Sequence, residues 1–274
     1  FHFVRWILAG QTYSTANPLT VANVTADMAL TAEFAADSFT VRFEAGPNGV
    51  IAGAAVQVIT AGGDAAPVTA LADSGSHFVR WLSAGTEFSR ENPLTVPNVS
   101  AALVLTAEFA VDTYAVTFTA GANGTLTGAI EQTLVHGGTA EPVTAVPDTG
   151  SRFVRWTLNG LTFSTSNPLT LTGVTGNLAV SAEFALNTYT VTFLAGANGG
   201  LRGAVRQVVA HGAGTSLVTA VPNTGHHFVR WLVDETPYSE ENPLALPGIT
   251  ADVTLTTEFA VNTYAVGFLT GPNG

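Results

Sequence analysis

The chain has 274 residues, of which 46% are hydrophobic and 11% charged, so it holds enough apolar material for packed cores and too little charge for a disordered chain. Its net charge is −11 and its nine basic residues are all arginine, which argues against nucleic acid or an anionic membrane as partners. Cysteine is absent, which excludes disulfides and thiolate metal sites, and no window approaches the roughly 18 unbroken apolar residues of a membrane span.

Four copies of the motif FVRW organise the sequence. Their tryptophans are Trp6, Trp81, Trp156 and Trp231, a step of 75 residues each time. The NPL triplets and the AEF or TEF triplets recur with the same step, and no insertion or deletion falls between these marks. A period this regular indicates tandem copies of one module.

Aligning the chain on the tryptophans gives the module boundaries. We expect whole modules at residues 38–112, 113–187 and 188–262. Residues 1–37 are then the C-terminal half of a module, and residues 263–274 are the first strand and turn of another. Because both ends cut through a module, we expect the molecule to continue beyond them, preferably as one polypeptide and alternatively by supplying these segments to a neighbouring copy. A signal peptide or anchor would not be visible in such a window.

Each module begins with a segment of alternating apolar residues, which is the period of a half-buried strand. In the second module this segment is TYAVTF at residues 113–118. The turn that follows is GANG at residues 121–124, and Asn-Gly is a strong signal for a hairpin because it tolerates positive φ. A weaker β-rich arm returns at Ala129–Val135.

The second half of the module starts with PVTAVPDTG at residues 142–150, which its prolines predict to be an edge strand or an irregular segment. FVRW then forms a strand in which Phe153 and Trp156 would point to opposite faces, so either both faces are covered or a bulge intervenes. The NPL segment predicts a turn, because a residue before proline avoids the helical region. The last strand, LVLTAEF at residues 103–109, buries alternate apolar residues and shows Glu108 on the other face.

Helical patterns are weak throughout, whereas threonine and valine are abundant, which suits strands. We therefore predict an all-β chain whose modules each have about six short strands, with at most one short helical turn per module. Only about two residues separate the last strand of one module from the first strand of the next. These short junctions predict an elongated rod in which each module touches only its neighbours.

The TGxxFVRW centre, the upstream YxVTF strand, the NPL turn and the closing LTAEF strand together resemble the internalin-type B-repeat family, in its divergent form. The match covers nearly the whole chain, and the departures are Ser38-Phe39 in place of Thr-Tyr and an arginine before each tryptophan. Members of that family are modules of bacterial surface and secreted proteins, with a compact β-grasp-like fold, and usually serve as stalks or adhesive arrays. The resemblance therefore implies β-grasp-like modules and an extracellular or cell-surface location.

The recurring aromatic residues are candidates for hydrophobic cores. A tryptophan that recurs beside phenylalanine and valine is more often a core residue than a sugar-stacking platform. The expected core residues are Trp6, Trp81, Trp156, Trp231, Phe78, Phe153, Phe228, Phe109, Phe184, Tyr114 and Tyr189.

Two charged positions recur in every copy, an arginine before each tryptophan and the glutamate of AEF or TEF, whereas other charges vary. We interpret them as a structural ion pair, with a ligand site as the alternative. The candidate pairs are Arg5 with Glu33, Arg80 with Glu108, Arg155 with Glu183, and Arg230 with Glu258.

The sequence presents no constellation typical of catalysis or metal binding. The six histidines vary among the copies and would lie at different heights along the rod, so we interpret them as surface residues. Calcium-loop, nucleophile-elbow, phosphate-loop and dinucleotide motifs are absent. We therefore expect no enzyme activity, no catalytic residues, no cofactor and no metal.

These observations predict a structural protein, an extracellular repeat array of a bacterial surface protein that acts as a stalk, adhesin or filament component. Its expected partners are the neighbouring modules of the same chain, with further copies in a fibre, or a cell-surface or glycan ligand, as open alternatives. Nucleic acid and membrane insertion are not expected. The competing hypothesis is a carbohydrate-binding repeat region of a secreted enzyme, which exposed, coplanar tryptophans would favour and buried ones would exclude.

Overall fold

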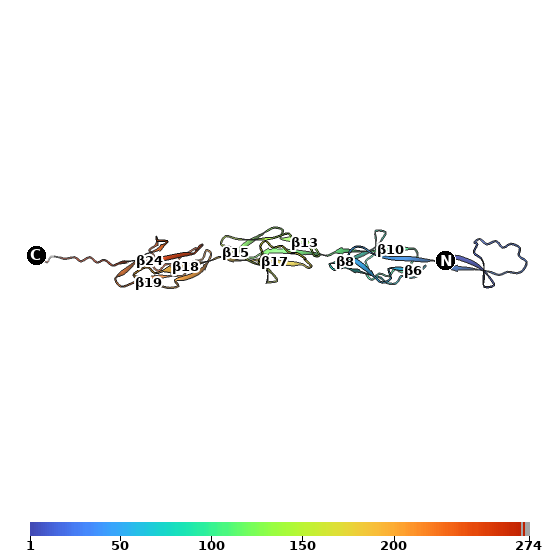
Figure 1. Ribbon diagram of the computed structural model, residues 1–274, viewed down its shortest axis with the longest axis horizontal. Helices are drawn as coiled ribbons and strands as arrows, with labels where there is room; N and C mark the ends of the chain where they lie inside the picture. Colours follow the sequence, from blue (N-terminus) through green and yellow to red (C-terminus); the bar gives the residue numbers. More distant parts are fainter. Residues whose placement is uncertain (270, 272–274) are drawn as a thin grey trace. The chain divides into compact units, whose positions relative to one another are not determined.

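The computed structural model describes residues 1–269 and 271. Every regular element among these residues is a β-strand, and none of them forms a helix (Figure 1). The predicted all-β class is thus confirmed. The described residues contain no helix long and apolar enough to cross a membrane.

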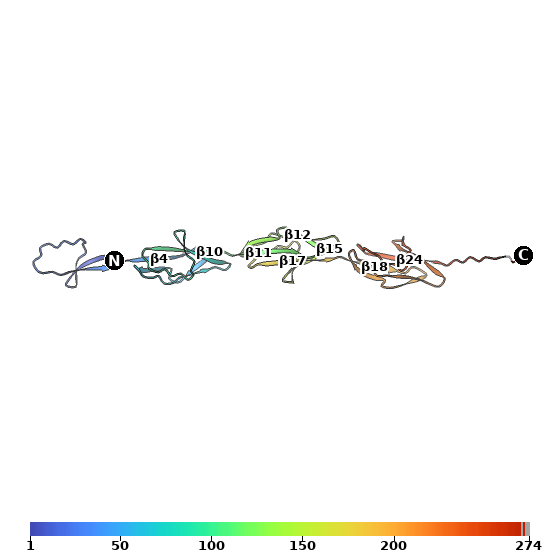
Figure 2. The same cartoon turned by 180° about the vertical axis from the view of Figure 1, so that it is seen from behind.

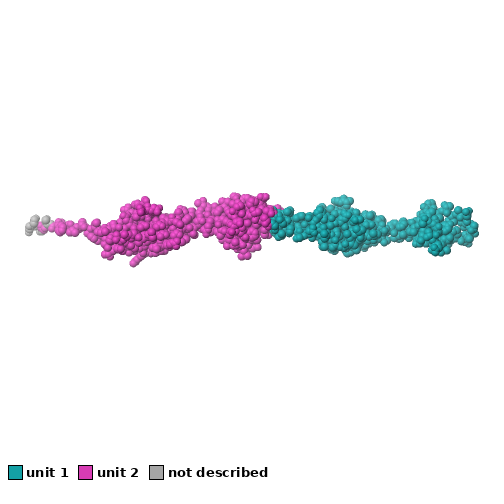
Figure 3. Space-filling model, viewed as in Figure 1, with its two compact units in different colours: residues 1–114, 134–138, 173–176 teal, residues 115–133, 139–172, 177–274 magenta. Residues whose placement is uncertain are grey.

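The chain divides into two compact units (Figure 3). The first comprises residues 1–114, 134–138 and 173–176, and the second comprises residues 115–133, 139–172 and 177–274.

Each whole repeat contains seven strands, one more than expected, because a short strand follows the Asn-Gly turn. The N-terminal half-repeat has β1 (His2–Leu8), β2 (Gln11–Ser14) and β3 (Leu30–Ala35). The first whole repeat has β4 (Ser38–Ala45), β5 (Gly49–Ala52), β6 (Val56–Thr60), β7 (Thr69–Ala72), β8 (Ser76–Ser83), β9 (Thr86–Ser89) and β10 (Leu103–Val111). The second has β11 (Thr113–Ala120), β12 (Gly124–Thr127), β13 (Glu131–Val135), β14 (Thr144–Pro147), β15 (Ser151–Leu158), β16 (Leu161–Ser164) and β17 (Leu178–Leu186). The third has β18 (Thr188–Leu194), β19 (Gly199–Arg202), β20 (Arg206–Ala210), β21 (Thr219–Pro222), β22 (His226–Val233), β23 (Thr236–Ser239) and β24 (Val253–Val261).

Five strands of each repeat form one mixed sheet, with the order β6-β4-β10-β8-β9 in the first repeat. The second and third repeats keep this order, as β13-β11-β17-β15-β16 and β20-β18-β24-β22-β23. The first and last strands of a repeat lie side by side and parallel at the centre of the sheet, as β11 and β17 do in Figure 2. The two remaining strands, β5 and β7 in the first repeat, form a separate antiparallel ladder.

The predicted returning arm does pair antiparallel with the first strand, as β6 does with β4, but the Asn-Gly turn does not connect the two directly. The asparagines do adopt positive φ, 69° at Asn48 and 70° at Asn123. However, the strand after the turn leaves the sheet to pair with β7, and β4 pairs with the later arm, β6. The reason for the glycine is space, since a Cβ on Gly49 would lie 2.4 Å from the ring of Phe109. The turn therefore brings backbone over an aromatic ring.

A β-bulge in the FVRW strand settles how its two aromatic rings reach the same core. Phe78 faces Phe109 and Arg80 faces Glu108, so Val79 is an extra residue in β8. The bulge turns Phe78 and Trp81 to one side, with ring centroids 5.8 Å apart. Of the two explanations that the sequence left open, the bulge is the one observed.

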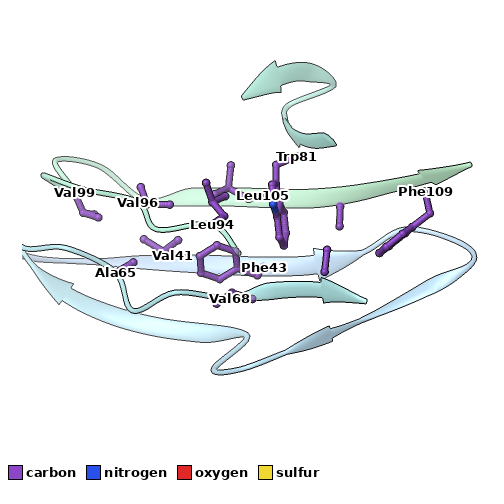
Figure 4. Close-up of a cluster of buried hydrophobic side chains, with 12 residues drawn as sticks. Val41, Phe43, Ala65, Val68, Trp81, Leu94, Val96, Val99, Leu105 and Phe109 are labelled. Atoms are coloured by element: carbon purple, nitrogen blue, oxygen red, sulfur yellow. The ribbon is translucent and has the colours of Figure 1, made fainter. Parts of the chain in front are cut away.

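The core of the first repeat lies between the five-stranded sheet, the β5–β7 ladder and the loop after β9. Trp81 is fully buried and points toward Phe43 of β4, with ring centroids 5.6 Å apart and planes at 77° (Figure 4). Leu105 and Val41, on the central parallel strands, are also fully buried. The third repeat has an equivalent core around Trp231.

The chain after β24 carries the alternation of a first strand, but residues 263–269 form no strand. In the whole repeats that strand pairs with segments that come later in the same module, such as β6 and β10. Without them Tyr264 is 83% exposed and Phe268 94% exposed. The turn expected at 271–274 lies outside the described residues, apart from Gly271.

Candidate functional site

The tryptophans of the whole repeats are core residues. Trp81, Trp156 and Trp231 are each 0% exposed. Each indole Nε1–H donates a hydrogen bond of 3.0–3.1 Å to the backbone carbonyl ten residues later, just before the NPL triplet. Since a buried indole N–H needs an acceptor, this bond links the FVRW and NPL motifs physically. No face of these three rings is open for stacking on a sugar.

The other expected core residues differ in how deeply they are buried. Phe109 and Phe184 are 8% exposed, whereas the phenylalanines of FVRW are half-buried in each whole repeat. Tyr114 and Tyr189 are half-buried as well, and each ring lies 5.9 Å from a histidine ring. In the half-repeat Trp6 is half-buried, although its indole still donates to a carbonyl at 3.1 Å.

The asparagine of NPL has a role that the sequence analysis did not predict. Asn92 Oδ1 accepts a hydrogen bond from the Ala70 backbone N–H at 2.8 Å, and Asn92 Nδ2 donates to the Ala70 carbonyl at 2.7 Å. The side-chain amide thus pairs with β7 as a neighbouring strand would, and the Asn–Pro bond that follows is cis. The same pairing recurs at Asn167 and Asn242. The available signal was the asparagine before proline in every copy.

The repeated arginine and glutamate are neighbours in every copy, on the solvent side of the sheet. Arg80 Nε lies 2.5 Å from Glu108 Oε2, and the corresponding distance between Arg155 and Glu183 is 2.6 Å. Arg5 and Glu33 form the same pair in the half-repeat. The fourth pair, Arg230 with Glu258, is 3.0 Å apart without hydrogen-bond geometry at Nε. These side chains are about one third to one half exposed, and the two members of each pair stand opposite each other on neighbouring strands.

The arginine makes a second contact that varies among the copies. In the first repeat Arg80 Nη1 also bonds Glu87, which in turn bonds Arg90. Hydrogen bonds from Arg90 and then Arg80 lower the pKa of Glu87 below its usual value. Bonds to Glu108 and then Glu87 raise the pKa of Arg80. In the second repeat a threonine, Thr162, takes the place of Glu87. A second partner that changes from copy to copy is typical of a solvated surface and not of a ligand site common to all copies.

Three histidines are more buried than the surface interpretation expects: His226, at the start of β22, and two at junctions. His136 and His211 are half-buried, and each lies at the junction between two successive repeats. His77 and His227 are exposed, and their Nδ1 atoms lie 2.7 Å from Asp112 and 3.0 Å from Asn262. Among the described residues, no group of three or more histidine, aspartate and glutamate side chains could hold a metal ion.

One exposed aromatic residue recurs in every copy, on the short strand after FVRW. Its exposed fraction is 41% at Phe88, 43% at Phe163 and 52% at Tyr238. Beside Tyr238 an open groove of about 280 Å³ is lined by residues that include Ile249 and Asp252. The 75-residue spacing marked this position in the sequence, but spacing alone does not show whether an aromatic residue is buried or exposed.

Comparison with known proteins identifies the repeats. The model of the divergent InlB B-repeat domain matches three successive segments, residues 39–113, 114–188 and 189–263. No curated protein matches the chain. The three matched segments together cover most of the sequence, and the resemblance noted from the motifs is confirmed. The chain therefore belongs to the divergent InlB B-repeat family.

Proposed function

We propose that this chain is a non-enzymatic structural array of a bacterial surface protein, held outside the cell, where it acts as a stalk. The observation that carries the proposal is that four repeated side chains hold the fold of each whole repeat together. The tryptophan fills the core, the asparagine pairs with a strand, and the arginine and glutamate bind each other. A module whose repeated chemistry is internal can be multiplied to gain length, because no copy depends on a ligand.

The short connections between repeats support the same proposal. A single residue, Asp112, stands between β10 and β11, and a single residue, Asn187, stands between β17 and β18. A connection this short restricts bending far more than a flexible linker of glycine and serine does. An array built this way would place whatever it carries at a defined distance from its attachment point. The proposal requires no cofactor, no nucleic acid and no membrane insertion.

A deletion series tests the stalk proposal. Small-angle X-ray scattering would compare the chain with a variant that lacks residues 113–187, one complete module. A stalk predicts that the maximum dimension falls by roughly 30–40 Å, the span of a compact module of this size. A variant that lacks residues 188–262 is the matched control and should show the same decrease. A maximum dimension that stays the same after either deletion would contradict a stalk.

A second candidate, carbohydrate binding, is favoured by the recurring exposed aromatic residue and the adjoining groove. The buried tryptophans remove the platforms first considered for it, but Tyr238 presents a half-exposed ring next to the carboxylate of Asp252. An aromatic face and a hydrogen-bonding carboxylate suit a neutral sugar. A glycan array probed with the chain and with a Tyr238→Ala, Phe163→Ala variant would test it. Binding that disappears in the variant would support this function, and no binding by the parent chain would remove it.

A further inference from the structure

The junction residue joins two successive repeats through its backbone. The N–H of Asp112 donates to the carbonyl of Gly75 at 2.9 Å, and its own carbonyl accepts from the N–H of His136 at 2.8 Å. Gly75 belongs to the turn before β8, in the preceding repeat, and His136 follows β13, in the next repeat. The backbone of Asp112 is thus hydrogen-bonded to the preceding repeat and to the next one.

The second junction has the same arrangement. Asn187 donates to the carbonyl of Gly150 at 2.8 Å and accepts from the N–H of His211 at 2.8 Å. The first of these two junctions has an aspartate and the second an asparagine, so the backbone hydrogen bonds form whether or not the side chain is charged.

The imidazole of the following repeat lies directly on the glycine of the preceding one. A Cβ added to Gly75 would come within 2.1 Å of the His136 ring, and one added to Gly150 within 2.1 Å of the His211 ring. Tyr114 supports the His136 ring from the side, with its hydroxyl 3.4 Å from Nδ1. A flat ring on a residue without a side chain gives a closer approach than any other residue would permit at that position.

These glycines also have positive φ, and comparison with other glycines separates the two requirements. Gly75 has a φ of 76° and Gly85, in the β8–β9 turn, a φ of 79°, but a Cβ on Gly85 would meet no atom within 4 Å. Gly225, which is the third repeat's equivalent of Gly75 in the turn before β22, has a φ of 82° and is likewise open. Positive φ therefore favours glycine at all three positions. Of the three, only Gly75 also has an imidazole packed against it.

We propose that the histidine seated on the glycine is a lock that couples adjacent repeats, and that the residue at this position sets how tightly each junction is held. The junction at Asp37 gives the contrast. Ala61 stands where the later repeats have His136 and His211, and it keeps the backbone hydrogen bond to the Asp37 carbonyl, at 2.8 Å, without an imidazole. The junctions at Asp112 and Asn187 thus add an imidazole to their backbone hydrogen bonds, whereas Ala61 contributes only its backbone N–H to the junction at Asp37. The inference concerns the folded chain and does not depend on where the protein resides or what it carries.

Hydrogen exchange of the junction amides tests the lock in the full chain. The amides to follow are those of Asp112 and His136, because both bond across the junction. His136→Ala removes the ring without adding strain, and we expect both amides to exchange about fivefold faster or more, since local opening governs their exchange. Amides at the centre of β10 serve as an internal reference and should not change.

Two glycine variants complete the test. Gly75→Ala and Gly85→Ala impose the same positive-φ strain, but only Gly75→Ala displaces the imidazole. Faster exchange at Asp112 in Gly75→Ala alone supports the lock, and equal effects of the two variants overturn it. Unchanged exchange in His136→Ala also overturns it, even if Gly75→Ala destabilises its repeat. Such a failure would leave the stalk proposal standing, because the deletion series measures the span of a module and does not depend on the histidine.

Discussion

The half-repeat at residues 1–37 and the whole repeats contain the same FVRW, NPL and AEF segments, but only the whole repeats have the strands that precede them. Several features are common to both. The FVRW strand has the same bulge, the arginine binds the same glutamate, and the indole donates to the carbonyl ten residues later. These interactions lie within β8, β10 and the loop after β9 or their equivalents, so the second half of a repeat sets its own geometry.

What the half-repeat lacks is burial. Phe34 is 59% exposed, whereas its equivalent Phe109 is 8% exposed, and Trp6 is half-buried whereas Trp81 is fully buried. The strands that make the difference bring Phe43 against the tryptophan and Gly49 against Phe109. The first half of a repeat therefore shields the aromatic side chains of the second half from water. Burial of apolar surface is the largest stabilising contribution to folding.

Truncation of the tryptophan should separate the two regions most strongly. Trp156→Ala removes a fully buried ring, and we expect a loss of about 3–5 kcal/mol in the free energy of unfolding of the second repeat. Native-state hydrogen exchange of the slowest β17 amides reports this repeat separately, since an array need not unfold in one step. Trp6→Ala is the matched variant and should cost much less. Equal losses in the two variants would contradict the assigned role of the first-half strands.

The glycine that lies under the phenylalanine gives a sharper comparison within one strand. A Cβ on Gly199 would come within 2.2 Å of the Phe259 ring, whereas a Cβ on the adjacent Gly200 would meet nothing within 4 Å. We expect Gly199→Ala to destabilise the third repeat by about 1–3 kcal/mol, the range for overpacking. Gly200→Ala should stay within about 0.5 kcal/mol, as surface changes usually do. The slowest β24 amides measure both, and a neutral Gly199→Ala would refute the close approach.

The asparagine before proline should matter only where a strand is present to receive it. Asn167→Ala leaves the buried backbone N–H and carbonyl of Ala145 without their partner, and we expect a loss of about 1–3 kcal/mol. Asn17→Ala occupies the same place in the half-repeat, which has no equivalent of β14, and should have a smaller effect. Exchange of the Ala145 amide is the direct readout. Similar losses at the two positions would show that the asparagine acts through its own turn.

Breaking the arginine–glutamate pair should give the smallest difference in stability loss between the half-repeat and the whole repeats. It is present in both and partly exposed in both, so Arg155→Met and Arg5→Met should each change stability by only about 0–1 kcal/mol. Thermal unfolding at low and high salt would show whether the small difference is electrostatic, because salt screens exposed pairs. A loss in Arg155→Met comparable to that of Trp156→Ala would mean that the pair contributes more than a partly exposed pair does.

The sequence was informative wherever one residue type has one physical use. Exact recurrence predicted the modules, abundant β-branched residues predicted an all-β chain, and the tryptophan beside phenylalanine pointed to the core. The order of strands could not be read in the same way. The parallel pairing of β4 with β10 joins segments about 60 residues apart, and nothing in either strand specifies its partner.

The sequence misled where one motif has two uses. Asn-Gly supports positive φ in a hairpin, but at Gly49 the glycine is needed because Phe109 lies against it. His136 is a polar residue in a variable position, which is typical of a surface, and its contact with Gly75 comes from a different repeat. Both cases depend on a partner distant in sequence, which local pattern does not reveal.

Solvent exchange of the four indole N–H protons shows whether the repeated tryptophans are core residues that the first half of each repeat shields from water. All four indoles donate to a carbonyl at 3.0–3.1 Å, so the hydrogen bond is the same and only burial differs. One two-dimensional NMR spectrum of the unmodified chain resolves them, with Trp6→Phe to assign the first. We expect slow exchange for Trp81, Trp156 and Trp231 and clearly faster exchange for Trp6. Four indoles that exchange alike, at the rate of a solvent-exposed ring, would contradict it.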